Sequence, residues 1–347
     1  MRLDRLGDVI LSTPAIAAVR AAYPDAHLAV MVRPQCREAV EGLPELNEVL
    51  LYDKDQRHRS VLSTVRFAWQ LRRQRFDVAV ILHPSHRSHW MPFLAGIPRR
   101  VGWDRKSGWL LTHRVPHVKQ EGTQHESAYT LDVVRRLGID GAPRSLHFPS
   151  QPTAAATVQT WLAQQGVRSG DQVIAMHPSA SCVSKRWLPE RFAAVADTLI
   201  AEGKRVVVVA GPDDRIFGEQ MVRVCRQPVL NAIGQFSVAE LGELLRRCAL
   251  LISNDSGPVH VAVAVGTPVV DIFGRNQRGL SPLRWGPLGP HDQVLHKEVG
   301  CPVCLAHNCN IEFKCLTEIS AQEVLGAAHT ILNQGNVRGR LDAMPRG

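Results

Sequence analysis

Residues 254–260, which read Asn-Asp-Ser-Gly-Pro-Val-His, combine residue types that bind phosphate. They follow an apolar run at 250–253, so they would open a helix directly after a strand. Such a loop offers unpaired backbone N–H groups and the positive end of a helix dipole, and both suit a diphosphate. An alternative stays open, in which Ser256 merely caps the helix and His260 is a buried core histidine. The candidate binding residues are Asp255, Ser256, Gly257 and His260.

A second set of candidate anion ligands follows the apolar run 173–176. Residues 177–181 contain small hydroxyl residues, and residues 184–190 read Ser-Lys-Arg-Trp-Leu-Pro-Glu. Ser181 and Lys185 would supply a hydrogen-bond donor and a positive charge to the same anion. A solvated basic loop without a ligand explains the same residues, so both interpretations stay open.

Asp214 stands after the β-branched run 206–209, at the end of the segment Gly-Pro-Asp-Asp. A carboxylate at this place can accept hydrogen bonds from ribose hydroxyls. Acidic residues also favour helix N-termini because of the helix dipole, so the residue type alone does not separate the two roles.

Asp8 is the candidate for proton transfer. Residues 2–9 read Arg-Leu-Asp-Arg-Leu-Gly-Asp-Val and precede a helix that contains Thr13 and Pro14. Gly7 permits a ligand to approach the backbone closely, and the carboxylate of Asp8 beside it could accept a proton. An aspartate at a helix N-terminus has the same local pattern, so the residues alone do not establish catalysis.

Four of the eight cysteines are crowded together, in the pattern Cys301-x2-Cys304-x4-Cys309-x5-Cys315. Four thiolates suffice for a tetrahedral zinc site, and Cys-x2-Cys is a common half-site. The pattern makes these residues candidate ligands of a structural zinc ion, with no open position for catalysis. Free thiols, disulfides and an iron–sulfur cluster are the alternatives that the spacing leaves open.

These candidate residues are positioned by alternating apolar and amphipathic segments. In the first half, the predicted strands are 27–32, 48–52 and 78–82, and the predicted helices are 13–22, 60–74 and 124–137. In the second half, the predicted strands are 173–176, 205–210, 250–253 and 268–273, and the predicted helices are 153–165, 189–202, 213–225, 237–247 and 258–265. Strands that alternate with helices indicate a doubly wound parallel sheet in each half. Ligands of such sheets bind at the carboxyl ends of the strands, where the candidates lie.

The chain is too long for one hydrophobic core, since single cores stop growing at about 250–300 residues. A Pro-, Ser- and Gly-containing stretch at 141–152 is the predicted linker. The sequence therefore predicts an α/β protein with Rossmann-like domains at 1–150 and 151–335, and a disordered tail at 336–347.

Composition excludes several classes of protein. The longest apolar runs, 206–210 and 259–265, fall short of the ~20 residues of a membrane helix. The first residues imitate a secretory signal, but Asp8 and Pro14 argue against cleavage, so a cytoplasmic protein is expected. The formal net charge of +9 indicates an anionic substrate or surface. With 5% aromatic residues and dispersed basic residues, a zinc-containing nucleic-acid-binding protein is the weaker alternative.

Three segments in register resemble glycosyltransferase family nine, the lipopolysaccharide heptosyltransferases. They are residues 5–14, 184–190 and 254–268, and the resemblance spans about residues 2–330. It implies a GT-B fold, in which two Rossmann-like domains face a central cleft. The N-terminal domain would bind the acceptor and the C-terminal domain the nucleotide sugar. The implied reaction inverts the anomeric centre, needs no metal or other cofactor, and uses ADP-heptose and a lipopolysaccharide-core or other glycan acceptor.

The resemblance also implies roles for particular residues. Asp8 would take the proton of the acceptor hydroxyl. Lys185 and the 255–260 loop would stabilise the departing diphosphate, with Asp255 as a positioning residue. Asp214 lies near a ribose-binding acidic position of the family, and Gly7 and Ser181 complete the predicted site.

The resemblance further implies partners. An anionic glycolipid acceptor would draw the chain to the inner membrane face as a peripheral protein, and the chain would act as a monomer without nucleic acid. The alternative activity is that of a sugar-nucleotide epimerase of similar fold, which would use other acid–base groups.

One departure from the family concerns the first strand. Family members usually have a hydrophobic strand ahead of the segment that contains Asp8, and here only residues 1–3 precede it. We expect that the start is truncated and that the centre of the first sheet is left unfilled. Adding about six apolar residues upstream should therefore raise thermal stability.

Overall fold

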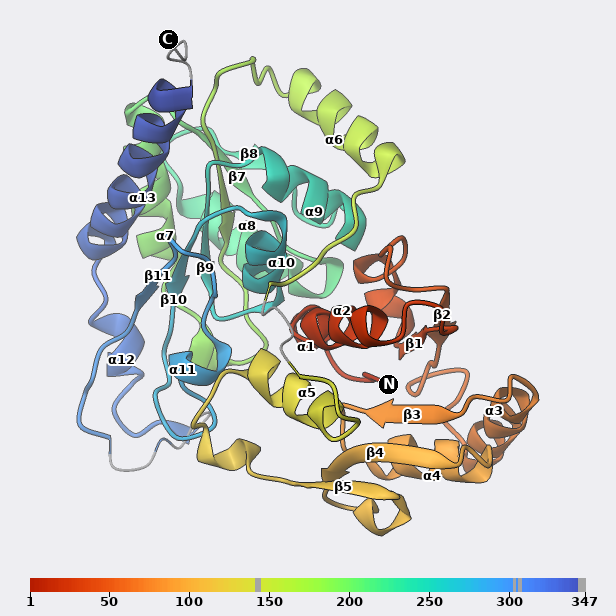
Figure 1. Cartoon of the computed structure of the whole chain (residues 1–347). Helices are drawn as coiled ribbons and strands as arrows, with labels where there is room; N and C mark the ends of the chain where they lie inside the picture. Colours follow the sequence, from red (N-terminus) through yellow and green to blue (C-terminus); the bar gives the residue numbers. More distant parts are fainter. Residues whose placement is uncertain (141–144, 302–303, 305–307, 343–347) are drawn as a thin grey trace. The chain divides into compact units, whose positions relative to one another are not determined.

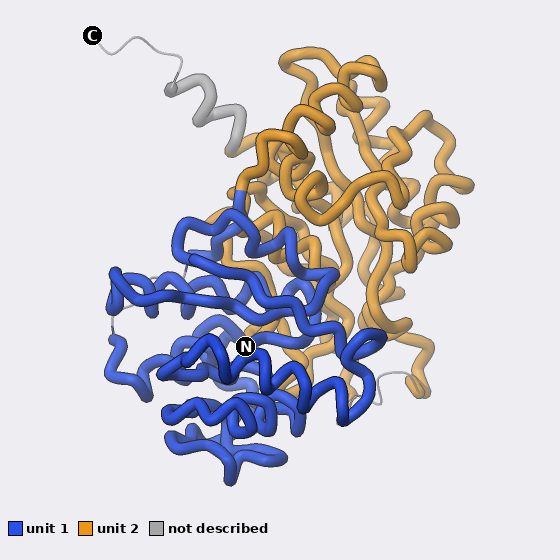
Figure 2. Tube along the Cα trace, turned by 90° about the vertical axis from the view of Figure 1, so that its right-hand side faces the viewer, with its two compact units in different colours: residues 1–149 blue, residues 150–347 orange. Residues whose placement is uncertain are grey.

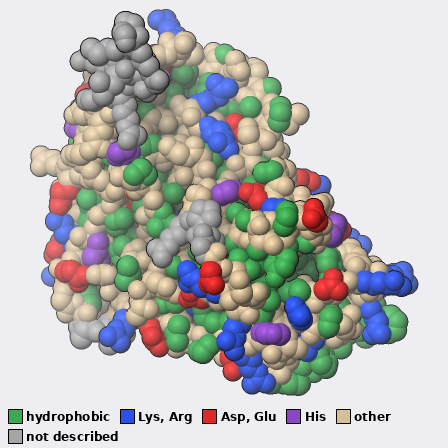
Figure 3. Space-filling model, in the orientation of Figure 1, with side chains coloured by type: hydrophobic (Ala, Val, Ile, Leu, Met, Phe, Trp, Pro, Cys, Tyr) green, Lys and Arg blue, Asp and Glu red, His purple; other side chains and the backbone are tan. Residues whose placement is uncertain are grey.

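The computed structural model of the chain describes residues 1–140, 145–301, 304 and 308–342, with side chains as far as residue 334. The chain divides into two compact units, Met1–Pro149 and Ser150–Gly347 (Figures 1 and 2). The sequence placed a boundary at residue 150. On the face shown in Figure 3, Lys and Arg side chains are interspersed with Asp and Glu side chains.

Unit 2 contains a six-stranded sheet in the order β11-β10-β9-β6-β7-β8. All of its strand pairs are parallel. The strands are β6 (Val173–His177), β7 (Arg205–Val208), β8 (Leu230–Asn231), β9 (Leu250–Asn254), β10 (Val269–Ile272) and β11 (Gln293–Leu295). Every residue of β6, β9 and β10 is buried, as expected for parallel strands that are covered on both faces.

Helices cover the two faces of this sheet (Figure 1). On one face α7 contacts α8 and α13, and on the other α9 contacts α6 and α10. The longer helices are α6 (Pro152–Gln164), α7 (Pro189–Ala201), α8 (Arg215–Val224), α9 (Val238–Arg247), α10 (Gly257–Val265) and α13 (Ala321–Asp342). The short ones are η4 (Val183–Lys185), η5 (Pro212–Asp214), α11 (Pro282–Trp285) and α12 (Lys314–Thr317). Residues 336–342, which were expected in a disordered tail, continue α13, and residues 343–347 lie outside the described residues.

Unit 1 contains two parallel sheets instead of the single sheet that its sequence predicts. One pairs β1 (Ala29–Val32) with β2 (Glu48–Leu51), and the other has the order β3-β4-β5. The latter strands are β3 (Val78–Ile81), β4 (Arg99–Asp104) and β5 (His113–Pro116). The helices are α1 (Leu6–Ile10), α2 (Thr13–Ala22), η1 (Pro34–Ala39), α3 (Val61–Arg73), α4 (His86–Leu94), η2 (Gly108–Leu110), η3 (Lys119–Glu121) and α5 (Glu126–Arg135).

The first two residues connect the sheets of unit 1. The Met1 amino group donates to the Val80 carbonyl at 2.7 Å, and the Leu82 N–H donates to the Met1 carbonyl at 3.1 Å. The Arg2 N–H donates to the Met31 carbonyl at 2.9 Å. Beyond these residues, apolar side chains of α2, β1 and β3 line a cavity of about 120 Å³. Met1 and Arg2 therefore occupy the end of a slot between β1 and β3 whose remainder is a cavity.

Candidate active site

The carboxyl ends of β6 and β9 form the switch point of the unit 2 sheet. The chain proceeds from β6 to β7 and β8 on one side, and then returns to place β9 on the other side of β6. His177 at the end of β6 is in register with Ser253 of β9. Ligands of doubly wound sheets bind at this crevice, so the residues that follow β6 and β9 form the candidate donor site.

Ser256 does not cap α10 through its side chain. It occupies the N-cap position without a side-chain capping bond, and its hydroxyl lies 3.0 Å from Nδ1 of His177 and 3.1 Å from Oγ of Ser253. The interpretation of Ser256 as a simple helix cap is therefore wrong. The serine instead joins the start of α10 to the end of β6, so the first-turn N–H groups of α10 are held at the switch point.

His177 is a site residue that the sequence did not single out. It is buried, and burial lowers its pKa to about 4, although the nearby Asp214 carboxylate opposes the shift. The imidazole is therefore neutral at physiological pH, and one ring nitrogen can accept the Ser256 hydroxyl. The signal in the sequence was a histidine at the last position of a buried strand.

Lys185 and Asp255 form an ion pair across the same edge. Nζ of Lys185, in η4, lies 2.5 Å from Oδ2 of Asp255, which follows β9. The Lys185 side chain is 17% exposed and that of Asp255 is 7% exposed. Asp271, in the neighbouring strand β10, is fully buried, and among the described residues its carboxyl oxygens have no hydrogen-bond partner. Burial and the nearby Asp255 raise the pKa of Asp271 well above its ordinary value, although Lys185 opposes the shift.

Asn254 positions the loop that carries Lys185. Its side-chain nitrogen donates to the Pro178 carbonyl at 2.8 Å, and its side-chain oxygen accepts the Trp187 N–H at 3.0 Å. Gly274 lies beneath the same loop, where a Cβ atom would come within 2.5 Å of the Ser184 carbonyl oxygen. A larger residue at position 274 would therefore push η4 away from the switch point.

The other residues predicted to bind the nucleotide-sugar donor lie around the carboxyl edge of the unit 2 sheet. Gly257 begins α10, and His260 is buried in its first turn. Ser181 is exposed in the loop after β6. Asp214 ends η5 and makes no side-chain capping bond to α8, so capping does not account for its carboxylate.

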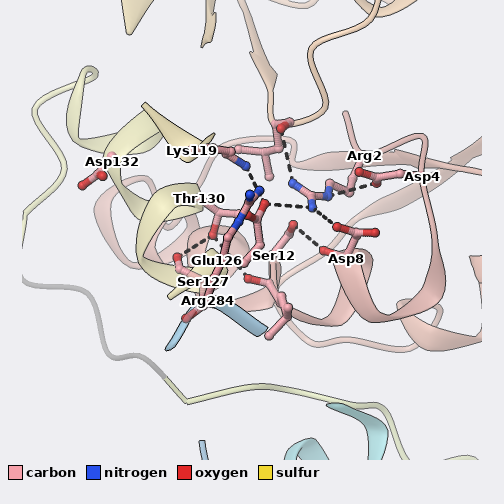
Figure 4. Close-up of polar contacts among 12 residues, drawn as sticks. Arg2, Asp4, Asp8, Ser12, Lys119, Glu126, Ser127, Thr130, Asp132 and Arg284 are labelled. Atoms are coloured by element: carbon pink, nitrogen blue, oxygen red, sulfur yellow. Dashed lines mark hydrogen bonds and ion pairs between the residues drawn. The ribbon is translucent and has the colours of Figure 1, made fainter. Parts of the chain in front are cut away.

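Asp8 lies in the first turn of α1 in unit 1 (Figure 4). One of its carboxylate oxygens, Oδ1, accepts a hydrogen bond from Nη2 of Arg2 at 2.5 Å. Its side chain is 17% exposed, while Arg2 is almost completely buried. Gly7, the preceding residue, is buried within α1. The arrangement fixes one oxygen of Asp8 on a buried cation and keeps the carboxylate partly accessible.

The sequence did not identify the other charged residues that pair with Arg2. Its guanidinium also contacts Glu126 of α5, and Glu126 in turn accepts a hydrogen bond from Lys119 of η3 (Figure 4). Asp4 lies 3.0 Å from Nε of Arg2. Burial raises the pKa of Asp4 to about 7, although Arg2 favours its charged form.

The environment of His83, just beyond β3, is positive. Burial lowers the pKa of His83 to about 3, and the charges of Arg2, Lys54, Lys106 and Lys119 lower it further. The histidine is therefore neutral. Two of the four cations, Arg2 and Lys119, also contact the Glu126 carboxylate.

The cysteine cluster lies beside the candidate donor site. Cys301, Cys304, Cys309 and Cys315 line one pocket with residues of the β10–α11 and β11 segments. All eight cysteines are free thiols, and Sγ of Cys309 accepts the Phe313 N–H at 3.3 Å. Burial and the other three thiols raise the pKa of Cys315 to about 11. Within the described ranges, no group of three or more Cys, His, Asp or Glu side chains is arranged to hold a metal ion.

In the part of the chain that the structure describes, no helix combines the length and the apolar character needed to cross a bilayer.

A family model described as glycosyltransferase family 9 (heptosyltransferase) matches residues 64–314. Over 348 aligned residues the chain is 26% identical to lipopolysaccharide heptosyltransferase 2 of Salmonella typhimurium, covering 96% of this chain and 97% of the relative. It is 29% identical to lipopolysaccharide heptosyltransferase 3 of Escherichia coli, covering 77% of this chain and 80% of the relative.

Solved structures extend this similarity to the fold. A family 9 glycosyltransferase from Veillonella parvula superposes with a TM-score of 0.87 at 27% identity, covering 96% of both chains. The ADP-heptose lipopolysaccharide heptosyltransferase II of Escherichia coli gives 0.79 at 24% identity, covering 97% of this chain and 100% of that one. The predicted GT-B fold class is confirmed.

Proposed function

The chain belongs to glycosyltransferase family 9, and from that premise we propose that it transfers heptose from ADP-heptose to a lipopolysaccharide-core acceptor with inversion at the anomeric carbon. That it is a glycosyltransferase follows from the family. The donor is proposed because one Escherichia coli enzyme of this fold is named as an ADP-heptose heptosyltransferase, and another Escherichia coli heptosyltransferase was solved with ADP.

The observation that carries the proposal is the meeting of Lys185, Asp255 and the start of α10 at one switch point. A diphosphate there would receive the N–H groups of α10 and the Lys185 ammonium. Because the negative charge of the diphosphate grows as its bond to the sugar breaks, these groups stabilise the transition state more than the ground state. They supply the positive charge, so the proposal requires no catalytic metal.

Asp8 is the proposed general base. The acceptor hydroxyl oxygen forms a bond to the anomeric carbon, and the bond from that carbon to the diphosphate oxygen breaks. The bonding electron pair leaves with ADP, and the hydroxyl proton moves to the Asp8 carboxylate. With Oδ1 bound to Arg2, the other oxygen, Oδ2, is the one proposed to take the proton.

Lys54 and Lys106, two of the cations that act on His83, support an anionic acceptor bound by unit 1. With a formal net charge of +9, the chain is proposed to act as a cytoplasmic monomer that associates peripherally with the inner membrane, where a phosphorylated glycolipid would be presented. Unit 2 is proposed to bind the donor through Ser181, Asp214 and His260 in addition to the diphosphate ligands.

The cysteine cluster is proposed to hold a structural zinc ion away from the reaction. The four cysteines line one pocket, and a backbone N–H bonded to Cys309 is the type of contact that orients a thiolate ligand. Among the described residues no group of three ligands is already arranged for a metal, so binding would require the cysteine side chains to rearrange.

The test of the proposed function measures ADP release from ADP-heptose with and without a deacylated lipopolysaccharide core. We expect ADP release and a heptosylated product only when the acceptor is present. Conversion of the donor without an acceptor would instead support an epimerase and would contradict the transferase.

A further inference from the structure

Four buried or nearly buried side chains form a continuous chain of charges that ends on Asp8 (Figure 4). Nζ of Lys119 donates to Oε1 of Glu126 at 2.5 Å, and Nη2 of Arg2 lies 3.1 Å from the same oxygen. That same Nη2 donates to Oδ1 of Asp8 at 2.5 Å. Glu126 is 1% exposed, Arg2 is 2% exposed and Lys119 is 4% exposed.

Each inner member of this chain is fixed by further contacts. The Arg2 guanidinium donates to the Leu82 carbonyl at 3.2 Å, which anchors it at the end of β3. The Lys119 ammonium lies 5.0 Å from the centre of the Trp103 ring and 5.9 Å from that of Tyr129. Because these groups cannot rotate freely, the position of Glu126 determines where Arg2 can hold Asp8.

α5 is attached to the Asp8 segment at a second point. Thr130 lies one turn after Glu126 on the same face of α5, and its hydroxyl reaches the carbonyls of Ser127 and Leu11. The Ser12 hydroxyl, next to Leu11, donates to the Asp8 carbonyl at 2.8 Å. The helix that carries Glu126 is therefore packed against the segment that carries Asp8.

We propose that Glu126 is a positioning residue, which together with Lys119 holds Arg2 on one oxygen of Asp8 and keeps the other oxygen directed at the acceptor hydroxyl. This inference rests on the proposed function. It adds a role for α5 and η3, which the transferase reaction alone does not assign.

The same chain balances the charges beside Asp8. Arg2 and Lys119 are buried cations, and Glu126 carries the negative charge that lies between them. Asp4, the neutral His83, the Met1 amine and Cys36 are further titratable groups near this chain, and Lys54 and Lys106 are nearby cations. Without Glu126, the two buried cations would have less compensation, and Arg2 would lose a contact that orients it on Asp8.

The experiment compares Glu126→Gln with Asp132→Asn. Both changes neutralise an acid of α5, but Asp132 pairs with Arg135 and Gln124 and lies apart from the Asp8 chain (Figure 4). For Glu126→Gln we expect kcat to fall roughly tenfold to a hundredfold, because the base is misplaced, with donor KM unchanged. Asp132→Asn should change neither quantity.

A second pair of variants separates positioning from stability. Lys119→Met should lower thermal stability, because it removes one of the two buried cations that pair with Glu126. The double variant Glu126→Gln/Lys119→Met removes both charges of the Lys119–Glu126 pair, so it should regain thermal stability. Its kcat should stay low, because Arg2 has still lost the Glu126 carboxylate that orients it on Asp8. If Glu126→Gln does not fold, the kcat of the double variant still tests the positioning role.

The outcomes distinguish the two proposals. If the unaltered chain transfers heptose and Glu126→Gln keeps a normal kcat, the positioning role is wrong and the transferase stands. Recovery of both stability and kcat in the double variant would also overturn the positioning role. If the unaltered chain shows no acceptor-dependent transfer, the proposed function itself fails.

Discussion

The Nζ atom of Lys185 lies 2.5 Å from Oδ2 of Asp255, and this ion pair joins the loop after β6 to the loop after β9. A bound diphosphate would compete with Asp255 for the lysine. Asp255 therefore keeps Lys185 at the switch point before the donor arrives, which lowers the entropy lost on binding.

Replacing Lys185 by alanine should weaken ADP binding about tenfold to a hundredfold, because a charge-assisted hydrogen bond to the diphosphate is lost. kcat should fall as well, since the charge on the leaving group is then less stabilised. Isothermal titration with ADP measures the first effect. Lys204→Ala is the matched control. Lys204 lies at the amino end of β7, away from the carboxyl ends of the strands where the donor site lies, and its ammonium bonds Gln172. Equal ADP affinity in both variants would exclude Lys185 from the donor site.

Asp271 should make stability depend on pH. Its folded-state pKa is raised, so the folded chain retains a proton that the unfolded chain releases above about pH 4. The free energy of unfolding should therefore fall as pH rises, by at most about 1.4 kcal/mol per pH unit from this group. Asp271→Asn removes this contribution. In urea unfolding, the free energy of unfolding of the variant should therefore rise relative to that of the unaltered chain between pH 5 and 8. A constant difference across that range would show that Asp271 is ionised in the folded chain.

The slot between β1 and β3 should accept an apolar extension joined to Met1. An extension of about six residues rich in Val and Ile could pair with both strands and fill the cavity, so the melting temperature should rise by several degrees. A Gly-Ser extension of equal length is the control.

The same extension has a second readout. Burial lowers the pKa of the Met1 amine to about 5, so the unaltered chain should lose stability as pH falls from 8 to 5, when the unfolded amine gains a proton first. The extension removes this amine from the slot and should reduce that loss. Equal melting temperatures of the apolar and Gly-Ser variants would contradict the prediction that the slot between β1 and β3 accepts an added strand.

The cysteine cluster should bind about one zinc ion per chain. Metal analysis of the purified chain tests this, with Cys301→Ser/Cys304→Ser as the variant and Cys182→Ser/Cys225→Ser as the control. Binding should weaken as pH falls, because zinc requires deprotonated thiols and the pKa of Cys315 is high without metal. Zinc-free protein, or iron with acid-labile sulfide, would contradict the zinc site.

Much of unit 2 could be predicted from the sequence. Its central strands are continuous β-branched or apolar runs, and the residues after them meet at one edge because the strands are parallel. Lys185 and Asp255 could therefore be placed near each other, although 70 positions separate them. His177 was missed because a histidine that ends a strand reads as a boundary residue.

Unit 1 was less predictable. β4 begins with two arginines and β5 ends in proline, so neither resembles a buried strand, and α4 contains Pro92. Glu126 was missed because it lies more than a hundred residues from Arg2, and no local pattern links them. The available signal was a charged residue on the same helical face as Tyr129 and Val133, both of which are buried.

The most direct test of the central claim compares Asp8→Asn with the unaltered chain in acceptor-dependent heptose transfer, with ADP-heptose binding measured in parallel. Asparagine keeps the shape of Asp8 and removes its basicity. We expect turnover to fall by roughly 10²–10⁴, with donor affinity retained, because a general base contributes about that much. Near-normal turnover by Asp8→Asn would contradict the assignment of Asp8 as the base.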